Sequence, residues 1–315
     1  MPLAPAAHSA PALVQVENSA QSRPHSGLQH ADLVYEYLTE GGITRFTAIY
    51  FNPSGSAVIG PVRSARLVTL RLQKAYGGVL FYSGASTHVL DLIHAGNVPA
   101  LDEPADGGRY FTRDSSRQAP HNLFTSADRL AAGVNHEGTK VSYTPPAAGE
   151  PPAGGEQVGR VSFAMTDAHR ATFTYTASGQ TYGYSSETGP EVDTANGGSA
   201  LAIASVILVR VAHHDAGYVE DVLGESGIDF DLTGTGPADV YTRGRHLAAT
   251  WDVGDGSKPI SFTTSACARS IFSINISCSA RLISLSSCDL CRCSCILSIF
   301  SFMARNSDSR MSKSR

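Results

Sequence analysis

Polar side chains that could bind or transform a ligand concentrate in the first half of the chain, in three segments bounded by glycine or proline. Burying a guanidinium is costly unless it faces water, a carboxylate or a ligand, so we expect these arginines to gather with carboxylates in one region. Turns at strand ends are where such sites are commonly built. The candidate site residues are Glu36, Glu40, Arg45, Arg63, Ser64, Arg66, Arg113, Asp114, Arg117, His121 and Asn122.

Three functions are compatible with this set. Arg63 and Arg66 stand three residues apart at an expected loop-to-helix junction, where guanidinium groups and helix amides could bind one anion or polar ligand. Glu36 and Glu40 could instead be the acid and base of a hydrolase acting on cell-wall polymer. His121 could be the general base of the same hydrolase. The third function is a purely structural scaffold, in which carboxylates neutralise the arginines.

Motifs and composition exclude several other chemistries. The sequence has no serine nucleophile elbow, zinc motif or phosphate loop, and Ser64 lacks the lysine three residues later that a serine–lysine nucleophile needs. We therefore predict no metal and no cofactor. His213, His214 and Asp215 could be metal ligands, but adjacent histidines on a strand point to opposite faces, so we interpret this segment as exposed turn residues. A net charge of −4 gives no basis for nucleic-acid binding. No apolar run approaches the roughly 20 residues of a transmembrane segment.

The sequence predicts strands and helices that would position these residues in a mixed α/β domain over residues 11–146. We expect residues 1–10 to be a disordered start. β-Branched and aromatic residues predict a strand at 44–51, and apolar residues at helical spacing predict a helix at 66–76. Residues 31–40 fit either a strand or a helix. The other expected elements are strands at 13–16 and 79–82, a helix at 86–95 and a short helix that begins at Thr125 or Ser126.

A linker rich in proline and glycine, residues 145–155, separates this domain from a second one. After the linker, turn signals divide short strands and no helix is predicted. We therefore expect a smaller, mainly β domain over residues 147–262, so that the whole chain is α+β. The expected strands lie at 161–163, 171–175, 181–184, 204–211, 239–242, 247–251 and 259–262.

The composition changes sharply at Thr263. All 30 glycines and all 16 prolines precede it, whereas all six cysteines lie between Cys267 and Cys295. The cysteines from Cys288 to Cys295 could form a thiolate metal site. The alternative, which we favour, is an out-of-frame end of the gene. We accordingly expect residues 263–315 to be an aberrant tail that packs little against the body, and the second domain to be truncated.

Several motifs of the body resemble the YerB-like bacterial family, whose members are described as lipoproteins with a two-part domain of unknown function. The resemblance spans residues 11 to about 262 and is looser in the second part, over 206–211 and 236–251. The family pattern continues past a tryptophan like Trp251 into a final Gly-x-Thr-Trp segment, which is missing here. The motifs that carry the resemblance are residues 23–28, 31–36, 40–46, 59–66 and 113–123.

The resemblance implies an extracytoplasmic or membrane-anchored protein, although neither a signal peptide nor a lipobox cysteine is visible in this chain. It supplies no activity, cofactor or oligomeric state. The resulting hypothesis is a two-domain envelope protein that binds an anionic or polar ligand, such as a cell-wall fragment, or an envelope partner protein. The Arg- and Glu-rich set of the first domain would form its binding site.

Overall fold

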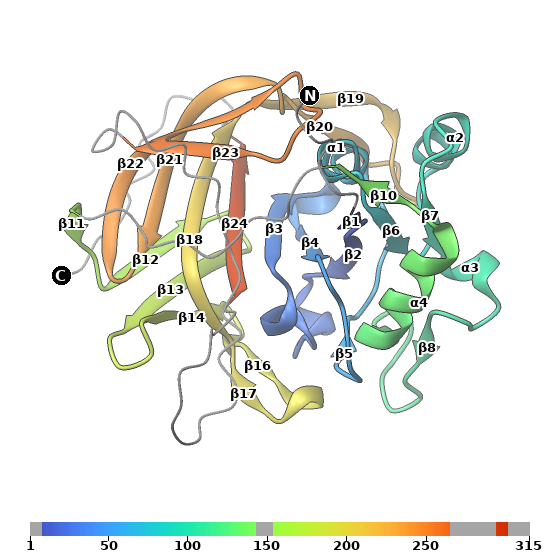
Figure 1. Cartoon of the computed structure of the whole chain (residues 1–315), viewed down its shortest axis with the longest axis horizontal. Coiled ribbons are helices and arrows are strands. Elements are labelled where there is room, and N and C mark those ends of the chain that lie inside the picture. The colour runs from blue at the N-terminus through green and yellow to red at the C-terminus, as the bar shows by residue number, and fades with distance from the viewer. Residues whose placement is uncertain (1–7, 143–153, 265–293, 302–315) are drawn as a thin grey trace, which may run out of the picture.

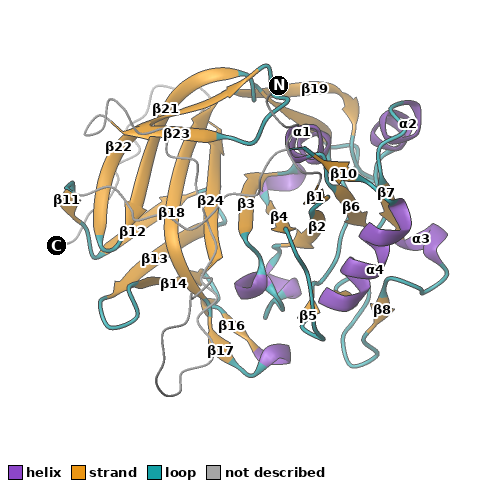
Figure 2. Ribbon diagram, in the orientation of Figure 1, coloured by secondary structure: helices purple, strands orange, loops and turns teal. Residues whose placement is uncertain are grey.

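The computed structural model describes residues 8–142, 154–264 and 294–301. Strands dominate, and one sheet of fifteen strands runs through both parts of the chain (Figure 1). The helices gather at the end of the molecule formed by the first part (Figure 2). The predicted two-part organisation and mixed composition are confirmed, although helices are a modest share of the structure.

The first part contains every α-helix of the described residues. Its strands are β1 (His8–Ser9), β2 (Ala12–Glu17), β3 (Leu33–Leu38), β4 (Thr44–Tyr50), β5 (Val58–Ile59), β6 (Val79–Tyr82), β7 (Ala100–Asp102), β8 (Thr112–Arg113), β9 (Leu123–Ser126) and β10 (Lys140–Val141). Its helices are α1 (Leu67–Tyr76), α2 (Thr87–Ala95), α3 (Glu103–Asp106) and α4 (Ala127–Glu137), with 3-10 turns η1 (Ala20–Ser22), η2 (Leu28–His30) and η3 (Glu40–Gly42).

Local sequence signals explain several of these boundaries. Helix α1 ends where Gly77 adopts a left-handed conformation with φ of 60°, which costs glycine little. Helix α2 begins after Ser86, whose side chain accepts a hydrogen bond from the amide of Val89. Residues 31–40, which fitted either a strand or a helix, contain strand β3 because Leu33, Tyr35 and Tyr37 alternate.

Helices cover both faces of the sheet in the first part. Strand β2 pairs antiparallel with β4 and parallel with β6. Strand β6 pairs parallel with β7, and helix α2 connects these two strands along the chain. Leu13 packs in a core layer that includes buried side chains of α1 and α2, whereas the next residue, Val14, packs in a second layer with α4. Because β2, β6 and β7 are parallel, their carboxyl ends lie at one edge of the sheet.

The second part is built from strands. They are β11 (Glu156–Gln157), β12 (Arg160–Ala164), β13 (Arg170–Thr176), β14 (Thr181–Ser186), β15 (Gly189–Pro190), β16 (Val192–Asp193), β17 (Ser199–Ala200), β18 (Ala202–Val211), β19 (His213–Val219), β20 (Ser226–Phe230), β21 (Gly234–Thr242), β22 (Arg245–Gly254) and β23 (Ser261–Thr264). The 3-10 turn η4 (Thr194–Asn196) connects β16 to β17. Residues 143–153, which include most of the expected linker, lie outside the described residues.

The hairpin of β19 and β20 extends from the second part over helix α1 of the first part (Figure 1). The interpretation of His213, His214 and Asp215 as turn residues is therefore wrong: they begin strand β19 and pair with β20. The pattern was missed because this strand is mostly exposed and lacks apolar alternation. On the hairpin, Tyr218 stacks on His88 of α2 with 4.2 Å between ring centroids.

Strand β24 (Ser294–Ser301) lies parallel between β18 and β3 and joins the sheets of the two parts. The sheet therefore follows the path β11-β22-β21-β18-β24-β3-β4-β2-β6-β7. The expectation that the segment after residue 262 packs little against the body is wrong for these eight residues and for Thr263 and Thr264, which pair with β22. Backbone pairing to strand edges requires no particular side chains. The cysteines from Cys267 to Cys293 lie outside the described residues.

Candidate functional site

The structure brings Glu40, Arg45, Ser64 and Arg66 together behind the loop that leads into α1. Arg66 Nε donates to Glu40 Oε2 at 2.7 Å, and a second guanidinium nitrogen contacts Oε1. Arg66 also lies 3.5 Å from a carboxylate oxygen of Glu220, on the connection between β19 and β20. Arg45 is 2% exposed and donates to the main-chain carbonyl of Ser64 at 3.0 Å.

Charges within this group satisfy one another. Burial alone would raise the pKa of Glu40, but the hydrogen bond and charge of Arg66 outweigh burial and lower it. Burial, assisted by the neighbouring charge of Arg66, lowers the pKa of Arg45 to about 10. Since Arg66 is bound by two buried carboxylates, its guanidinium is already occupied. This group matches the structural interpretation better than the binding one.

Arg63 and His121 meet at a residue that the sequence did not indicate. Glu17, at the carboxyl end of β2, is 3% exposed and lies 2.9 Å from His121 Nδ1 and 3.5 Å from Arg63 Nε. Ser19 also donates to its carboxylate at 2.9 Å. The only signal for Glu17 in the sequence is that an acidic residue ends a mostly apolar strand.

Arg113 and Asn122 form a third group, in which Arg113 ends β8 and Asn122 directly precedes β9. Arg113 donates to both carboxylate oxygens of Glu103 at 3.0 Å and to the side-chain oxygen of Asn122 at 3.0 Å. This arginine is about half exposed, which makes its ion pair weak in water.

Glu36 lies apart from Glu40, in a network that joins the two parts of the chain. It is completely buried, and its Oε1 accepts hydrogen bonds from Asn18, Thr44 and His169. His169 Nε2 is 2.7 Å from Glu36, and its Nδ1 is 2.7 Å from Glu187. The structure therefore places Glu36 and Glu40 in separate ion pairs.

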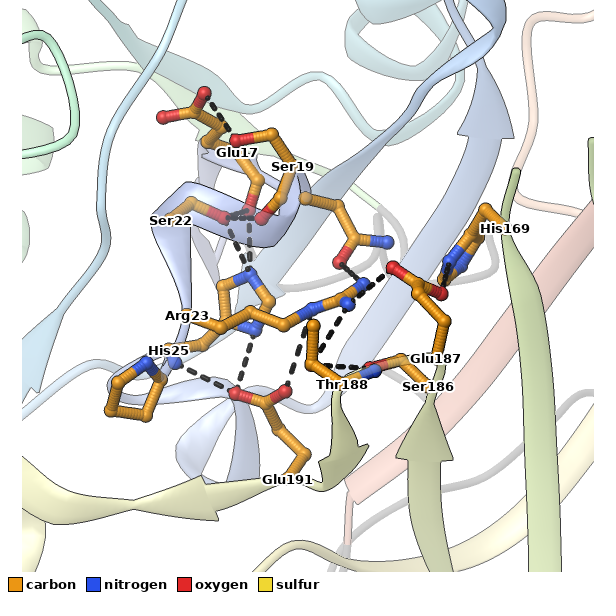
Figure 3. A network of polar contacts seen from close by, with 12 residues as sticks. Glu17, Ser19, Ser22, Arg23, His25, His169, Ser186, Glu187, Thr188 and Glu191 are labelled. Carbon is orange, nitrogen blue, oxygen red and sulfur yellow. Dashed lines mark hydrogen bonds and ion pairs between the residues drawn. The ribbon is translucent and has the colours of Figure 1, made fainter.

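The same network continues through Arg23 and His25 (Figure 3). Arg23 donates to Glu187 at 2.6 Å, and its Nε lies 3.7 Å from Glu191. His25 Nδ1 is 2.9 Å from Glu191, which also accepts the main-chain amide of His25. Burial alone would raise the pKa of Glu191, but the hydrogen bonds and charge of His25 lower it. Arg23 and His25 of the first part thus contact two carboxylates of the second, those of Glu187 and Glu191.

A cavity of about 760 Å³ lies beside this network. Most of its wall belongs to the first part, whereas Thr194 and Ala195 of η4 belong to the second. Two predicted site residues, Asp114 and Arg117, line it. The described residues that line it are Arg23, Pro24, Ser26, Val58, Thr112, Asp114, Ser116, Arg117, Phe124, Thr125, Ser126, Asp128, Arg129, Thr194 and Ala195.

Arg117 is positioned by main-chain contacts. Its two terminal nitrogens donate to the carbonyls of Ser22 and Pro24 at 2.5 and 3.1 Å, and its guanidinium lies 5.3 Å from the centre of the Phe124 ring. Carbonyls and an aromatic ring hold the cation without neutralising it. Within the part of the chain that the structure describes, no carboxylate forms an ion pair with Arg117 or with Arg129, which contacts the Thr112 hydroxyl.

Comparison with known proteins supports this two-part organisation. Residues 2–140 match the family described as "Protein of unknown function (DUF3048) N-terminal domain", and residues 160–271 match its C-terminal domain. The chain belongs to the DUF3048 family. The chain is 28% identical over 247 residues to "Putative lipoprotein YerB" of Bacillus subtilis (strain 168), covering 76% of this chain and 72% of that protein.

A solved structure shares the fold of this DUF3048 protein. The crystal structure of the YerB protein from Bacillus subtilis superposes with a TM-score of 0.71, over 92% of this chain and 90% of that one, at 23% sequence identity. The resemblance to the YerB-like family is thereby confirmed. Of the lining residues of the cavity, Thr194 and Ala195 fall in the C-terminal match and the others in the N-terminal match.

Neither metals nor membrane spans are indicated by the described residues. Among them, no three metal-ligating side chains form a group that could hold an ion. None of the helices in the described ranges is both long and apolar enough to cross a membrane.

Proposed function

We propose that this DUF3048 protein binds a small ligand in the cavity lined by Arg117 and Arg129. The ligand carries an oxyanion, which is either a carboxylate or a phosphate. The observation that carries the proposal is the guanidinium of Arg117, which lies at the wall of a cavity and forms no ion pair with a carboxylate of the described residues. Arginine presents a planar set of donors that matches an oxyanion, and here two main-chain carbonyls fix its orientation in advance. The volume of about 760 Å³ suits a small molecule.

The other arginines of the predicted site support this choice by contrast. Arg66 is occupied by Glu40 and Glu220, and Arg113 by Glu103. A ligand would have to displace a carboxylate to reach either of them. At Arg117 a ligand would not have to displace an ion-paired carboxylate of the described residues, so the cost of binding is lower there.

The hydrolase alternative receives less support. Glu36 and Glu40 are each buried in an ion pair, so neither carboxylate faces the cavity. His121 contacts Glu17, and neither residue is in the cavity lining. The lipoprotein name of the Bacillus subtilis relative favours a component of the cell envelope as the ligand.

Calorimetric titration with inorganic phosphate and with citrate tests the proposal. Arg117→Ala should lower the affinity for either anion by about 10- to 100-fold, the scale of one lost charge-assisted bond. Arg109→Ala is the matched control, because the guanidinium of Arg109 also lies over an aromatic ring, that of Tyr110, but outside the cavity. Equal affinities of wild type and Arg117→Ala, or no binding of any anion to the wild type, would overturn the proposal.

A further inference from the structure

The cavity contains carboxylates as well as arginines. Asp114 and Asp128 both line it, beside Arg117 and Arg129. The hydrogen bonds of Ser116 lower the pKa of Asp114, and the hydroxyl of Ser126 lowers the pKa of Asp128, so both side chains stay charged near neutrality. Two charged carboxylates repel a ligand that carries only anionic groups. They accept hydrogen bonds from a ligand that carries donor groups beside its anion.

Hydroxyl groups make up much of the remaining wall. A serine or threonine hydroxyl can both donate and accept, which suits a ligand dense in hydroxyls. A bare inorganic anion would contact the arginines and leave most of the cavity filled with water. The hydroxyl-bearing residues of the lining are Ser26, Thr112, Ser116, Thr125, Ser126 and Thr194.

The wall contributed by the second part is firmly attached to the first. Asn196 of η4 bonds the amide and the carbonyl of Val58 at 2.9 and 2.8 Å. Asp193 accepts the main-chain amide of Gly27 at 2.8 Å. Because these contacts fix η4 against the first part, the wall that it contributes is rigid, and binding a ligand there costs little ordering entropy.

We infer that the ligand is a sugar carrying a single anionic group. Arg117 and Arg129 bind the carboxylate or phosphate, and Asp114 and Asp128 accept hydrogen bonds from the sugar hydroxyls. This inference rests on the proposed anion-binding function and adds the chemical class of the ligand. Both signs of charge in one lining, together with the hydroxyls, match a hydroxyl-rich ligand with one anion better than a polyphosphate or an acidic peptide.

The test is a titration of the full chain with the 6-phosphates and the uronic acids of glucose, galactose and mannose, beside inorganic phosphate and the three neutral hexoses. At least one anionic sugar should bind tenfold or more tightly than both inorganic phosphate and its neutral parent sugar. The phosphate and uronate series distinguish the two sources of the anion.

Substitution of Asp128 tests the sugar half of the site separately. Asp128→Asn should weaken binding of the best anionic sugar about tenfold and leave inorganic phosphate unchanged or stronger. Asp255→Asn is the matched control, because Asp255 likewise accepts a nearby serine hydroxyl, that of Ser257, outside the cavity.

The outcomes separate the two proposals. If phosphate binds in an Arg117-dependent manner but no sugar improves on it, the inferred ligand class is overturned and the anion-binding function stands. If no anion binds at all, both are overturned. If the neutral hexoses bind as tightly as their anionic forms, the single anionic group is refuted.

Discussion

His169 Nε2 lies 2.7 Å from Glu36 Oε1, although the two residues are 133 positions apart and belong to different parts of the chain. Glu36 is completely buried, and its second oxygen, Oε2, has no hydrogen-bond partner among the described residues. A buried carboxylate depends strongly on the partners it has. The contact therefore couples the folding of the two parts as well as joining them.

Replacing His169 should destabilise the whole protein. His169→Ala removes one partner of Glu36 and leaves that buried carboxylate without its cation, so the free energy of unfolding should fall by about 3–5 kcal/mol. Urea unfolding followed by tryptophan fluorescence measures the change. His246→Ala is the control, because His246 pairs with Asp239 at 2.6 Å entirely within the second part. A smaller loss for His169→Ala than for His246→Ala would contradict the coupling.

The same network predicts how stability depends on pH. Burial alone would lower the pKa of His169, but the hydrogen bonds and charges of Glu36 and Glu187 raise it above the usual 6.5. A raised histidine pKa adds stability that is fully present below 6.5 and is lost as the pH rises through the higher folded value. Burial alone would raise the pKa of Glu187, but its own main-chain hydrogen bond and its contacts to Arg23 and His169 lower it to about 2. This stability is present above the usual 4.5 and is lost as the pH falls towards 2.

The two contributions overlap between about pH 4.5 and 6.5. Unfolding free energies measured from pH 3 to 9 should therefore pass through a maximum in or near this window. In His169→Ala the decline on the alkaline side should become shallower, while the decline below pH 4.5 should remain, because Arg23 still contacts Glu187. An unchanged alkaline limb in the variant would show that His169 does not carry that dependence.

Two arginines that contact the β19–β20 hairpin should differ in importance. Arg66 is 11% exposed and serves the buried carboxylates of Glu40 and Glu220, so Arg66→Ala should cost about 3–5 kcal/mol of unfolding free energy. Arg71 is 36% exposed and bonds Asp229 at 2.7 Å, so Arg71→Ala should cost at most about 1 kcal/mol. Thermal and urea unfolding of both variants provide the comparison. Similar losses in the two would argue against burial as the cause.

Local elements could be predicted from the sequence because their signals lie within a few residues. The strand and helix near residues 44–51 and 66–76 were predicted within one residue at each end, from β-branched residues and from the glycine after α1. The β19–β20 hairpin was missed because β19 has no buried residue and neither strand carries a clear apolar alternation.

Long-range partners could not be predicted in the same way. The sequence marked Arg63 and His121 as unusual but did not indicate Glu17, which precedes His121 by 104 residues and lies in a mostly apolar strand. The network of His169, Glu187 and Glu191 was likewise not predicted, because the local sequence around a carboxylate does not indicate which cation it contacts in the fold. Sheet order decides these pairs, and the pairing of β24 between β18 and β3 shows that backbone contacts can override a compositional expectation.

Arg63 and His121 both contact Glu17, so we expect each to stabilise its buried carboxylate when the other is removed. Single substitutions should therefore have small effects. Arg63 is 31% exposed and lies 3.5 Å from Glu17, so Arg63→Ala should cost only about 1 kcal/mol while His121 and Ser19 still bind the carboxylate. His121→Ala should cost a similar amount, because Arg63 remains. Removing both leaves a carboxylate that is 3% exposed with a single hydroxyl donor, and the double variant should therefore lose more than the sum of the single losses.

A double-mutant cycle by urea unfolding measures this excess, which should be about 1–3 kcal/mol. Arg113 with His121 is the control pair, because Arg113 contacts Glu103 and Asn122 and shares no carboxylate with His121. That cycle should close to within about 0.5 kcal/mol. Strict additivity of Arg63→Ala and His121→Ala would mean that Glu17 reaches water when either partner is lost, and that it does not depend on the two together.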